Sequence, residues 1–335
     1  MSNFLQKLKQ FVYQLFNSKS EKNVLKISYP TNINQQKFKN KKSFLDFAYS
    51  APYKYKNYYI PKRNSTQKRL ISQPTAELKF VQKDVINQLS AFLPIHNCAY
   101  AYVKNRNIKD NAELHRHSNY VLKLDFKHFF HSIRPKILFN QLEHHQIKLS
   151  EIDQTILSFI FFWREKKDSP LKLSIGAPSS PVLSNFIMYR FDEMLNQLCE
   201  KHQCIYSRYA DDITISSKYH FYDLNFPQHV QNLLDQEFQG KIKLNTQKTK
   251  YLTRKHRRFV TGITLTNDAK LSIGRQQKRL LSAKIHHFKI NKLNDEQQIL
   301  SLKGQLAFAF YIQPELKVQF SRKYGEELLH KIMSD

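Results

Sequence analysis

The 335-residue sequence predicts an α+β fold, in which antiparallel hairpins alternate with amphipathic helices and the chain ends in a helical tail. Two observations favour this class. Runs of β-branched and aromatic residues are separated by short turns, as in hairpins, and apolar residues elsewhere recur every three or four positions, as in helices. A chain of this length can bury a substantial core, divided into two or three subdomains.

The N-terminal part is polar and then changes to alternating strands and helices. Apolar residues near a helical period predict an amphipathic helix over Phe4–Leu15, which packs on the body or docks on another protein, and a polar linker follows. Residues Tyr58–Gln73 alternate as in a hairpin with basic flanks. Apolar positions from Leu78 to Phe92 then predict a helix of about four turns.

The middle of the chain contains a mostly apolar strand that ends in a carboxylate. This strand covers Val121–Asp125, and a longer helical stretch follows it through Trp163. Ser180 and Pro181 provide an N-cap and a first helical position, and apolar residues from Leu183 to Leu198 give that helix a buried face.

The C-terminal part contains a hairpin and a basic tail. The hairpin covers Ile205–Ser216, with Tyr209–Asp212 at its tight turn. A polar helix follows. We then expect, in chain order, strands near Lys243–Tyr251 and Phe259–Leu265 and a mostly helical tail from Ser272.

The charge balance predicts a polyanionic partner. The chain has 54 Lys and Arg against 27 Asp and Glu, a net charge of +27, which is enough to hold nucleic acid through counterion release. A basic membrane-surface protein is the alternative. No apolar run reaches the roughly 18 residues of a spanning helix, and Met1–Phe16 does not resemble a secretory signal, so we expect a cytoplasmic protein without a membrane partner.

The three cysteines are too few for a disulfide framework. Cys98, Cys199 and Cys204 agree with a reducing compartment. Cys199, His202 and Cys204 are close in sequence, but no second ligand pair stands at zinc spacing. We therefore predict no structural zinc.

Acidic residues at two places indicate a metal site in this otherwise basic chain. Asp211 and Asp212 lie at the hairpin turn, and Asp125 ends a strand at the margin of a sheet. Mg²⁺ prefers hard oxygen ligands, and phosphoryl transfer with two such ions needs bridging carboxylates. We predict Asp125 and Asp211 as the bridging pair and Asp212 as a supporting group, because neighbouring residues of an extended chain point to opposite faces. An isolated Asp-Asp pair would instead be a solvated turn.

Three motifs in order give the chain a resemblance to a known family. Leu124–Phe130, Gly176–Pro181 and Tyr209–Asp212 resemble the ordered motif set of reverse transcriptases. Asn111–His115 resembles the Asn-Ala-x-x-His element of retron reverse transcriptases, and Val260–Gly262 resembles their Val-Thr-Gly element. The resemblance extends roughly from residue 58 to residue 315.

The resemblance implies a right-hand polymerase that uses two Mg²⁺ ions and dNTPs to copy RNA into DNA. A structured noncoding RNA would serve as template and as primer through an internal 2′-hydroxyl, giving a branched RNA–DNA hybrid product, msDNA. An effector or toxin protein would act with it in antiphage defence. The implied divisions are an N-terminal helix and linker (1–50), fingers (51–120), a palm (121–270) with a fingers insertion near 140–175, and an α-helical thumb (271–335).

The resemblance also implies roles for individual residues. The metal ligands are Asp125, Phe126, Asp211 and Asp212, and the three aspartates are catalytic. The nucleotide contacts are Arg69 on the triphosphate with Lys62 and Arg63 beside it, Phe130 as an aromatic gate against a ribose 2′-hydroxyl, Gly176 and Ala177 near the base, and Lys248 as a proton donor to pyrophosphate or a phosphate ligand. The less favoured alternative for Phe130 is a core residue beside Phe129, and any of the basic groups could be a solvated surface charge.

Further residues are implied in RNA binding. They are Asn111, His115, Arg254, Arg257, Arg258, Val260, Thr261, Gly262 and, on a thumb helix along the duplex, Arg275, Lys278 and Arg279. For His115 we favour a structural or RNA-contacting role over acid–base catalysis.

The chain departs from the family motif at one point, and two alternative functions are considered. The family commonly has Pro-Gln before the glycine that is Gly176 here, whereas this chain has Ser174-Ile175, which puts sugar or base contacts there in doubt. A group II intron or diversity-generating reverse transcriptase is the nearest rival within the enzyme class. A catalytically silent RNA-binding scaffold that controls a toxin is the rival from another class, and the intact aspartates argue against it.

Overall fold

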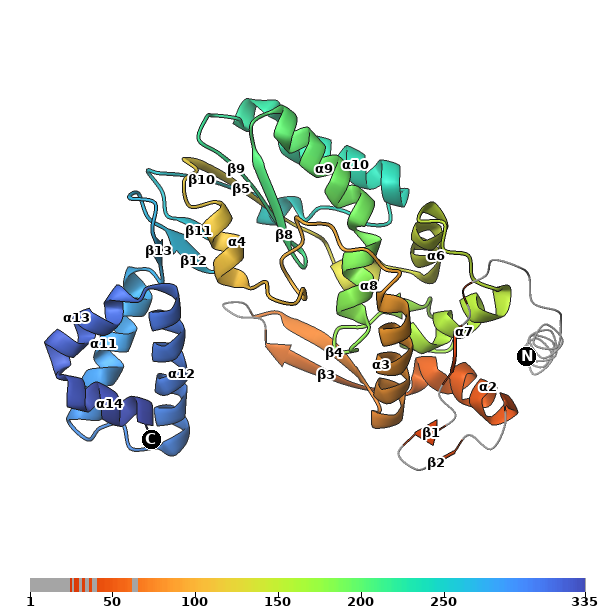
Figure 1. Cartoon of the computed structure of the whole chain (residues 1–335), viewed down its shortest axis with the longest axis horizontal. Coiled ribbons are helices and arrows are strands. Elements are labelled where there is room, and N and C mark those ends of the chain that lie inside the picture. Colours follow the sequence, from red (N-terminus) through yellow and green to blue (C-terminus); the bar gives the residue numbers. More distant parts are fainter. Residues whose placement is uncertain are drawn as a thin grey trace. The chain divides into compact units, whose positions relative to one another are not determined.

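The computed structural model describes residues 25, 27–29, 32–33, 36–37, 41–61 and 66–334 of the chain (Figure 1). These residues form two compact units, each made from three stretches of sequence. The first unit contains the described residues up to Tyr102 together with Phe126–Leu195 and Pro227–Asn245, and the second contains Val103–Asp125, Asn196–Phe226 and the residues from Thr246 onward. The helix predicted over Phe4–Leu15 lies outside the described residues.

The first unit contains the predicted basic hairpin and the helix after it. Strands β3 (Tyr55–Pro61) and β4 (Lys68–Pro74) pair in antiparallel register, which confirms the hairpin. Helix α3 (Ala76–Ser90) begins at the Thr75 cap and confirms the predicted helix, although Phe92 lies beyond its end. Other elements of this unit are β1 (Asn32–Ile33), β2 (Gln36–Lys37), α2 (Lys41–Ser50) and η1 (Ala51–Tyr53).

The long helical stretch predicted through Trp163 is wrong. The chain instead forms α5 (Phe129–Ser132), α6 (Pro135–His144) and α7 (Glu151–Phe161), and Trp163 lies in a strand. Arg134 precedes a proline and is extended, with φ −117° and ψ 159°, because the proline ring disfavours a helical conformation in the residue before it. Trp163 belongs to β6 (Phe162–Trp163), which pairs with β7 (Lys172–Leu173).

The helix predicted to begin at Ser180 is two helices. Helix α8 (Ser180–Ile187) is capped by Met188, and α9 (Tyr189–Lys201) follows, so the predicted apolar face is divided between them. The N-cap position is Ser179, and Pro181 lies in the first turn as the second helical residue. The polar helix after the acidic hairpin is α10 (Phe226–Phe238), preceded by η2 (Tyr222–Leu224).

The second unit is organised on a four-stranded antiparallel sheet in the order β10-β5-β9-β8. Strand β5 (Tyr120–Asp125) confirms the predicted central strand, and β8 (Ile205–Tyr209) with β9 (Asp212–Ser217) confirms the acidic hairpin. The strand expected near Lys243–Tyr251 begins later, as β10 (Lys250–Thr253), because Thr246–Lys248 forms the short helix η3.

A second, three-stranded sheet replaces the single strand predicted over Phe259–Leu265. These residues form a hairpin of β11 (Arg258–Val260) and β12 (Ile263–Leu265), and β13 (Leu271–Ser272) pairs with β12. Thr261 and Gly262 make the turn with φ of 47° and 86°. Positive φ at both central residues is what a two-residue type I′ hairpin turn requires.

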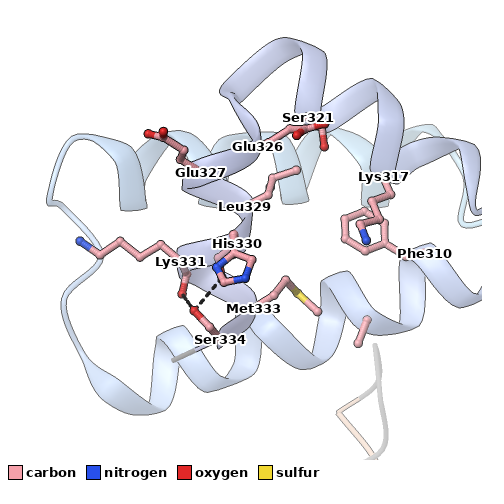
Figure 2. A pocket seen from close by; sticks show the side chains of 11 residues that line it. Phe310, Lys317, Ser321, Glu326, Glu327, Leu329, His330, Lys331, Met333 and Ser334 are labelled. Carbon is pink, nitrogen blue, oxygen red and sulfur yellow. Dashed lines mark hydrogen bonds between the residues drawn. The ribbon is translucent and has the colours of Figure 1, made fainter.

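The predicted helical tail is confirmed as a bundle of α11 (Arg275–Lys289), α12 (Glu296–Ile312), α13 (Glu315–Tyr324) and α14 (Glu326–Ser334). It shares one hydrophobic core with the sheets of the second unit, in which Val121, Val260, Leu281 and Leu306 are buried together. A pocket of 930 Å³ lies between α12, α13 and α14, where Phe310, Leu329 and Met333 line it (Figure 2). None of the described helices is both long and apolar enough to cross a membrane.

Candidate active site

The acidic turn is a two-residue loop between β8 and β9. Tyr209 and Asp212 are cross-strand partners, which leaves Ala210 and Asp211 as the central residues. Ala210 has φ 56°, the positive value that the first central residue of a type I′ or II′ turn adopts. Asp211 is therefore presented at the end of the hairpin, as the sequence predicts.

The sheet register brings two of the three predicted aspartates together. Asp125 on β5 and Asp212 on β9 are directly opposite partners. Opposite residues share a face of the sheet, with Cβ atoms about 5 Å apart. The exposed fraction of the side chain is 13% for Asp125 and 41% for Asp212, so solvent reaches both carboxylates. The neighbour that faces Asp125 is thus Asp212, and Asp211 lies in the adjoining turn.

Each of these carboxylates has a lysine beside it. Lys248 donates from Nζ to both carboxylate oxygens of Asp125, at 2.9 and 3.0 Å. Lys123 lies two residues before Asp125 on β5, and its Nζ is 3.6 Å from Oδ2 of Asp212. The short helix η3 packs next to β5 and so places Lys248 beside Asp125. Side chains alternate along a strand, so Lys123 lies on the same face of the sheet as Asp125 and Asp212, which we call the carboxylate face.

Burial raises the pKa of Asp125 above its ordinary value. The hydrogen bonds and charge of Lys248 oppose this shift, and the negative charge of Asp212 adds to it. The positive charges of Lys248 and Lys123 thus favour the ionised form of Asp125 and oppose the effect of its burial.

The donor set fits a hard divalent cation. Carboxylate oxygens from facing strands are ligands that Mg²⁺ and Mn²⁺ accept. Among the described residues, no group of three or more His, Cys, Asp or Glu side chains is arranged to hold a metal ion. Phe126 is also predicted as a metal ligand. Its ring is buried and its backbone forms a β-bridge with Leu244, so only its carbonyl oxygen could bind a metal ion.

Several predicted nucleotide contacts belong to the first unit. Gly176 has φ 123°, and a Cβ at this position would lie 3.2 Å from both Ile71 and the Ser72 carbonyl oxygen of β4. The Ser72 amide donates to the Ile175 carbonyl, so this part of the Ser174-Ile175 segment pairs with β4 through its backbone. Glycine is needed here because β4 approaches so closely. Ala177 is buried beside it.

The remaining nucleotide candidates differ in exposure. Arg69 lies exposed on β4, whereas Lys62 and Arg63 lie outside the described residues. Phe130 on α5 is partly buried, with its ring centroid 5.3 Å from that of Phe129. Phe129 is the fully buried member of this pair and stacks on Phe126, so Phe129 and not Phe130 fills the core position.

The Asn-Ala-x-x-His element forms helix α4 (Ile108–Leu114) and the residue that ends it. Its N-terminus has a capping box between Asn107 and Asp110. His115, at the other end, is buried and bonds through Nδ1 to Ser216 and through Nε2 to Ser207, both at 2.7 Å. Burial and the nearby charge of Lys123 lower the pKa of His115 to about 3, so the ring is neutral at physiological pH.

We revise the predicted RNA contacts of four residues because their side chains are buried. Asn111 and His115 are 1% and 0% exposed, and Val260 is 0% exposed in the core. Arg258 is 1% exposed and donates to the Ser118 and Thr266 carbonyls. His115 bonds to β9 and β8, and Arg258 bonds to the backbone at Ser118 and Thr266, so these two side chains have a structural role.

The other predicted RNA contacts remain available at the surface of the second unit. Arg254 and Arg257 are exposed near the β11–β12 hairpin, and Gly262 is exposed at its turn, whereas Thr261 is partly buried and donates to the Ile108 carbonyl. On α11, Arg275 and Arg279 are exposed and Lys278 is partly exposed.

Sequence reasoning missed Lys123 and Phe259. The ring centroid of Phe259 has three cations near it: Lys250 at 5.6 Å and both Lys123 and Arg257 at 5.9 Å. Lys250 is the cross-strand partner of Lys123, so both lie on the carboxylate face of the sheet. A signal for Lys123 existed in the sequence, because a lysine interrupts an apolar strand at the same parity as Asp125.

Comparisons with known proteins agree with the motifs. The family model described as "Reverse transcriptase (RNA-dependent DNA polymerase)" matches residues 60–265. The chain is 40% identical over 280 residues to the retron Ec83 reverse transcriptase of Escherichia coli, covering 83% of this chain and 89% of the relative. It is 31% identical over 306 residues to the retron Ec73 reverse transcriptase of Escherichia coli, covering 86% and 92%. A solved telomerase structure from Candida albicans has 13% identity and a TM-score of 0.44, covering 84% of this chain and 61% of that one.

Proposed function

Because the chain belongs to the retron reverse transcriptases and is an RNA-directed DNA polymerase, we propose that it copies a structured noncoding RNA into a branched RNA–DNA product, msDNA. In this proposal the RNA is both template and primer, and dNTPs are the substrates. An effector or toxin protein completes an antiphage defence system. The α+β polymerase fold and the need for a nucleic-acid template belong to the family as a whole.

The observation that carries the catalytic part of the proposal is the pairing of Asp125 with Asp212 across two strands, with Asp211 in the adjoining turn. We assign two Mg²⁺ ions to these carboxylates; such ions supply an activated attacking hydroxyl and neutralise charge on the leaving pyrophosphate. Asp125 and Asp211 would hold them, with the Phe126 carbonyl as a further ligand. Asp212 supports the site from the opposite strand.

Lys248 is the proposed proton donor to the leaving group. Its side chain is 54% exposed and now occupies both oxygens of Asp125. Once a cation neutralises Asp125, the ammonium is free to turn to phosphate oxygens. Proton donation and simple phosphate binding both use this one group.

Nucleotide recognition is assigned to residues of the first unit. Arg69 would bind triphosphate oxygens with Lys62 and Arg63, and Gly176 and Ala177 would let the backbone approach the base. Phe130, which is not needed to fill the core, is the proposed gate against ribonucleotides. The RNA itself would contact Arg254, Arg257, Thr261, Gly262, Arg275, Lys278 and Arg279.

The test is primer extension with the purified 335-residue chain, its cognate RNA, dNTPs and Mg²⁺. We expect DNA synthesis that Asp211→Asn abolishes while RNA binding persists. A silent scaffold would give no DNA from the unsubstituted chain. The junction of the product is then analysed: a 2′-linkage between RNA and DNA supports the retron reaction, whereas an ordinary 3′-primed product would contradict it and leave polymerase activity standing.

A further inference from the structure

The two ammonium groups at the carboxylate pair differ in how freely they can leave it. Lys248 stands on the short helix η3, and 54% of its side chain is exposed. Lys123 stands in the middle of β5, and only 9% of its side chain is exposed. An incoming cation can therefore displace Lys248 into solvent, but Lys123 has no comparable exit.

Residues of three other strands of the second unit surround Lys123. Its strand lies between β10 and β9, where its cross-strand partners are Lys250 and Thr214. Phe259 lies over its ammonium, 5.9 Å from the ring centroid to Nζ. Its nearest anionic atom is Oδ2 of Asp212 at 3.6 Å. A buried ammonium must keep such a partner, because an unpaired charge there would be strongly destabilising.

We propose that Lys123 is a positioning residue that permanently occupies Asp212, so that divalent cations are left to Asp125 and Asp211. This inference rests on the proposed function, because it assigns a task to a residue beside the same carboxylates. The pairing holds Asp212 on the strand and limits the negative charge that the site presents to cations.

The proposal has a definite electrostatic consequence. A fixed positive charge a few ångströms from a cation site opposes binding of that cation. Its removal would strengthen cation binding for two reasons: the repulsion disappears, and Asp212 becomes available as an extra ligand. If Lys123 did not hold Asp212, its replacement would remove only the repulsion, and Asp212→Asn would then change cation affinity equally with and without Lys123.

The experiment measures Mn²⁺ binding to the purified chain, free of nucleic acid, by electron paramagnetic resonance titration. We expect Lys123→Met to lower the dissociation constant roughly tenfold, which follows from removing one unit charge at this range. Lys123→Arg should bind Mn²⁺ as the unsubstituted chain does. Lys250→Met is the matched control, because it removes an exposed cation from the same face and ring without touching a carboxylate, and its effect should stay below about twofold.

A double-mutant comparison identifies Asp212 as the ligand set free. Asp212→Asn should weaken Mn²⁺ binding more in the Lys123→Met background than in the unsubstituted chain, because only there does Asp212 face the cation. Methionine fills a similar volume, and replacing a buried charge in this way is often neutral for stability. Thermal unfolding checks this, and Lys123→Gln serves if Lys123→Met does not fold.

Two results separate failure of this inference from failure of the proposed function. If Mn²⁺ binds the unsubstituted chain and is weakened by Asp125→Asn, but Lys123→Met binds it equally well or more weakly, Lys123 is not the positioning residue. If Mn²⁺ binding is absent, or insensitive to Asp125→Asn, Asp125 and Asp211 are not a cation site and the two-metal part of the proposed function is itself overturned.

Discussion

The two ends of one face of the four-stranded sheet use polar side chains in opposite ways. At one end Asp125 and Asp212 face each other, partly exposed, each beside a lysine. At the other end His115 is fully buried between Ser207 and Ser216. The first end keeps anionic oxygens within reach of solvent, whereas the second satisfies its polar atoms inside the protein.

In the proposed function, the difference separates chemistry from support on the same strands. Strand β9 provides Asp212 at one end and Ser216 at the other, on the same face because their positions differ by an even number of residues. Changes at the carboxylate end should therefore reduce DNA synthesis without unfolding the protein. Changes at the His115 end should reduce stability first.

The largest effect is expected from Asp125→Asn. Loss of the carboxylate removes several kcal/mol of transition-state stabilisation, so DNA synthesis should fall roughly a thousandfold or more. Single-nucleotide incorporation measures the rate, and thermal unfolding should show no loss of stability. Asp268→Asn, at an exposed aspartate of the same unit, is the control and should keep full activity. A strongly destabilised Asp125→Asn protein would contradict the division between a catalytic end and a supporting end of the sheet.

The next effect is expected from His115→Phe. The substitution leaves the buried hydroxyl of Ser207 without its ring partner and removes one partner of Ser216, so the free energy of unfolding should fall by about 3 kcal/mol. Urea denaturation measures this. His117→Phe, two residues away at an exposed position, is the matched control. Unchanged stability in His115→Phe would show that the buried bonds are dispensable.

Lowering the pH should reduce folding stability through His115 and increase it through Asp125. The pKa of His115 is lowered to about 3 in the fold from 6.5, so the unfolded chain binds more protons between these values and stability falls as pH drops below 6.5. The raised pKa of Asp125 acts the other way, since there the folded state binds more protons.

The His115 contribution can be isolated by comparing denaturation at pH 7 and pH 4.5. The free energy of unfolding should fall by about 2 kcal/mol more in the unsubstituted chain than in His115→Gln. Equal losses in the two proteins would mean that another group causes the acid sensitivity.

The smallest effect is expected from Ser118→Ala. The Ser118 hydroxyl lies 2.8 Å from that of Ser216, at the outer limit of the His115 network. Its loss leaves the bond between Ser216 and His115 in place, so the cost should be about 1 kcal/mol. Denaturation midpoints measure it, with the exposed Ser301→Ala expected to stay within about 0.5 kcal/mol of the unsubstituted chain. A cost as large as that of His115→Phe would contradict the ranking.

The elements of this site were predictable where the pattern is local. Alternating residues identify β5 and the acidic hairpin, and the turn chemistry places Asp211 at its end. Local patterns do not specify which strands pair or in what register, because that depends on packing between distant segments. The alignment of Asp125 with Asp212, and the hydrogen bonds from Lys248 to Asp125, therefore became visible only in the structure.

The burial of His115 illustrates the same limit. Its partners Ser207 and Ser216 are about a hundred residues away, and serine carries no sequence signal for a buried contact. The break before Pro135 had a signal in the proline, whereas the break at Met188 had none. Tertiary contacts decide such positions over local propensity.

The order in which the strands occur along the chain matters during translation. Strands β5, β8 and β9 are synthesised before Lys248 and β10. Until then β5 is an open edge with unpaired backbone groups, which invites pairing with other chains. The nascent polypeptide thus completes the proposed catalytic site late, and during that interval its exposed strand edge favours aggregation.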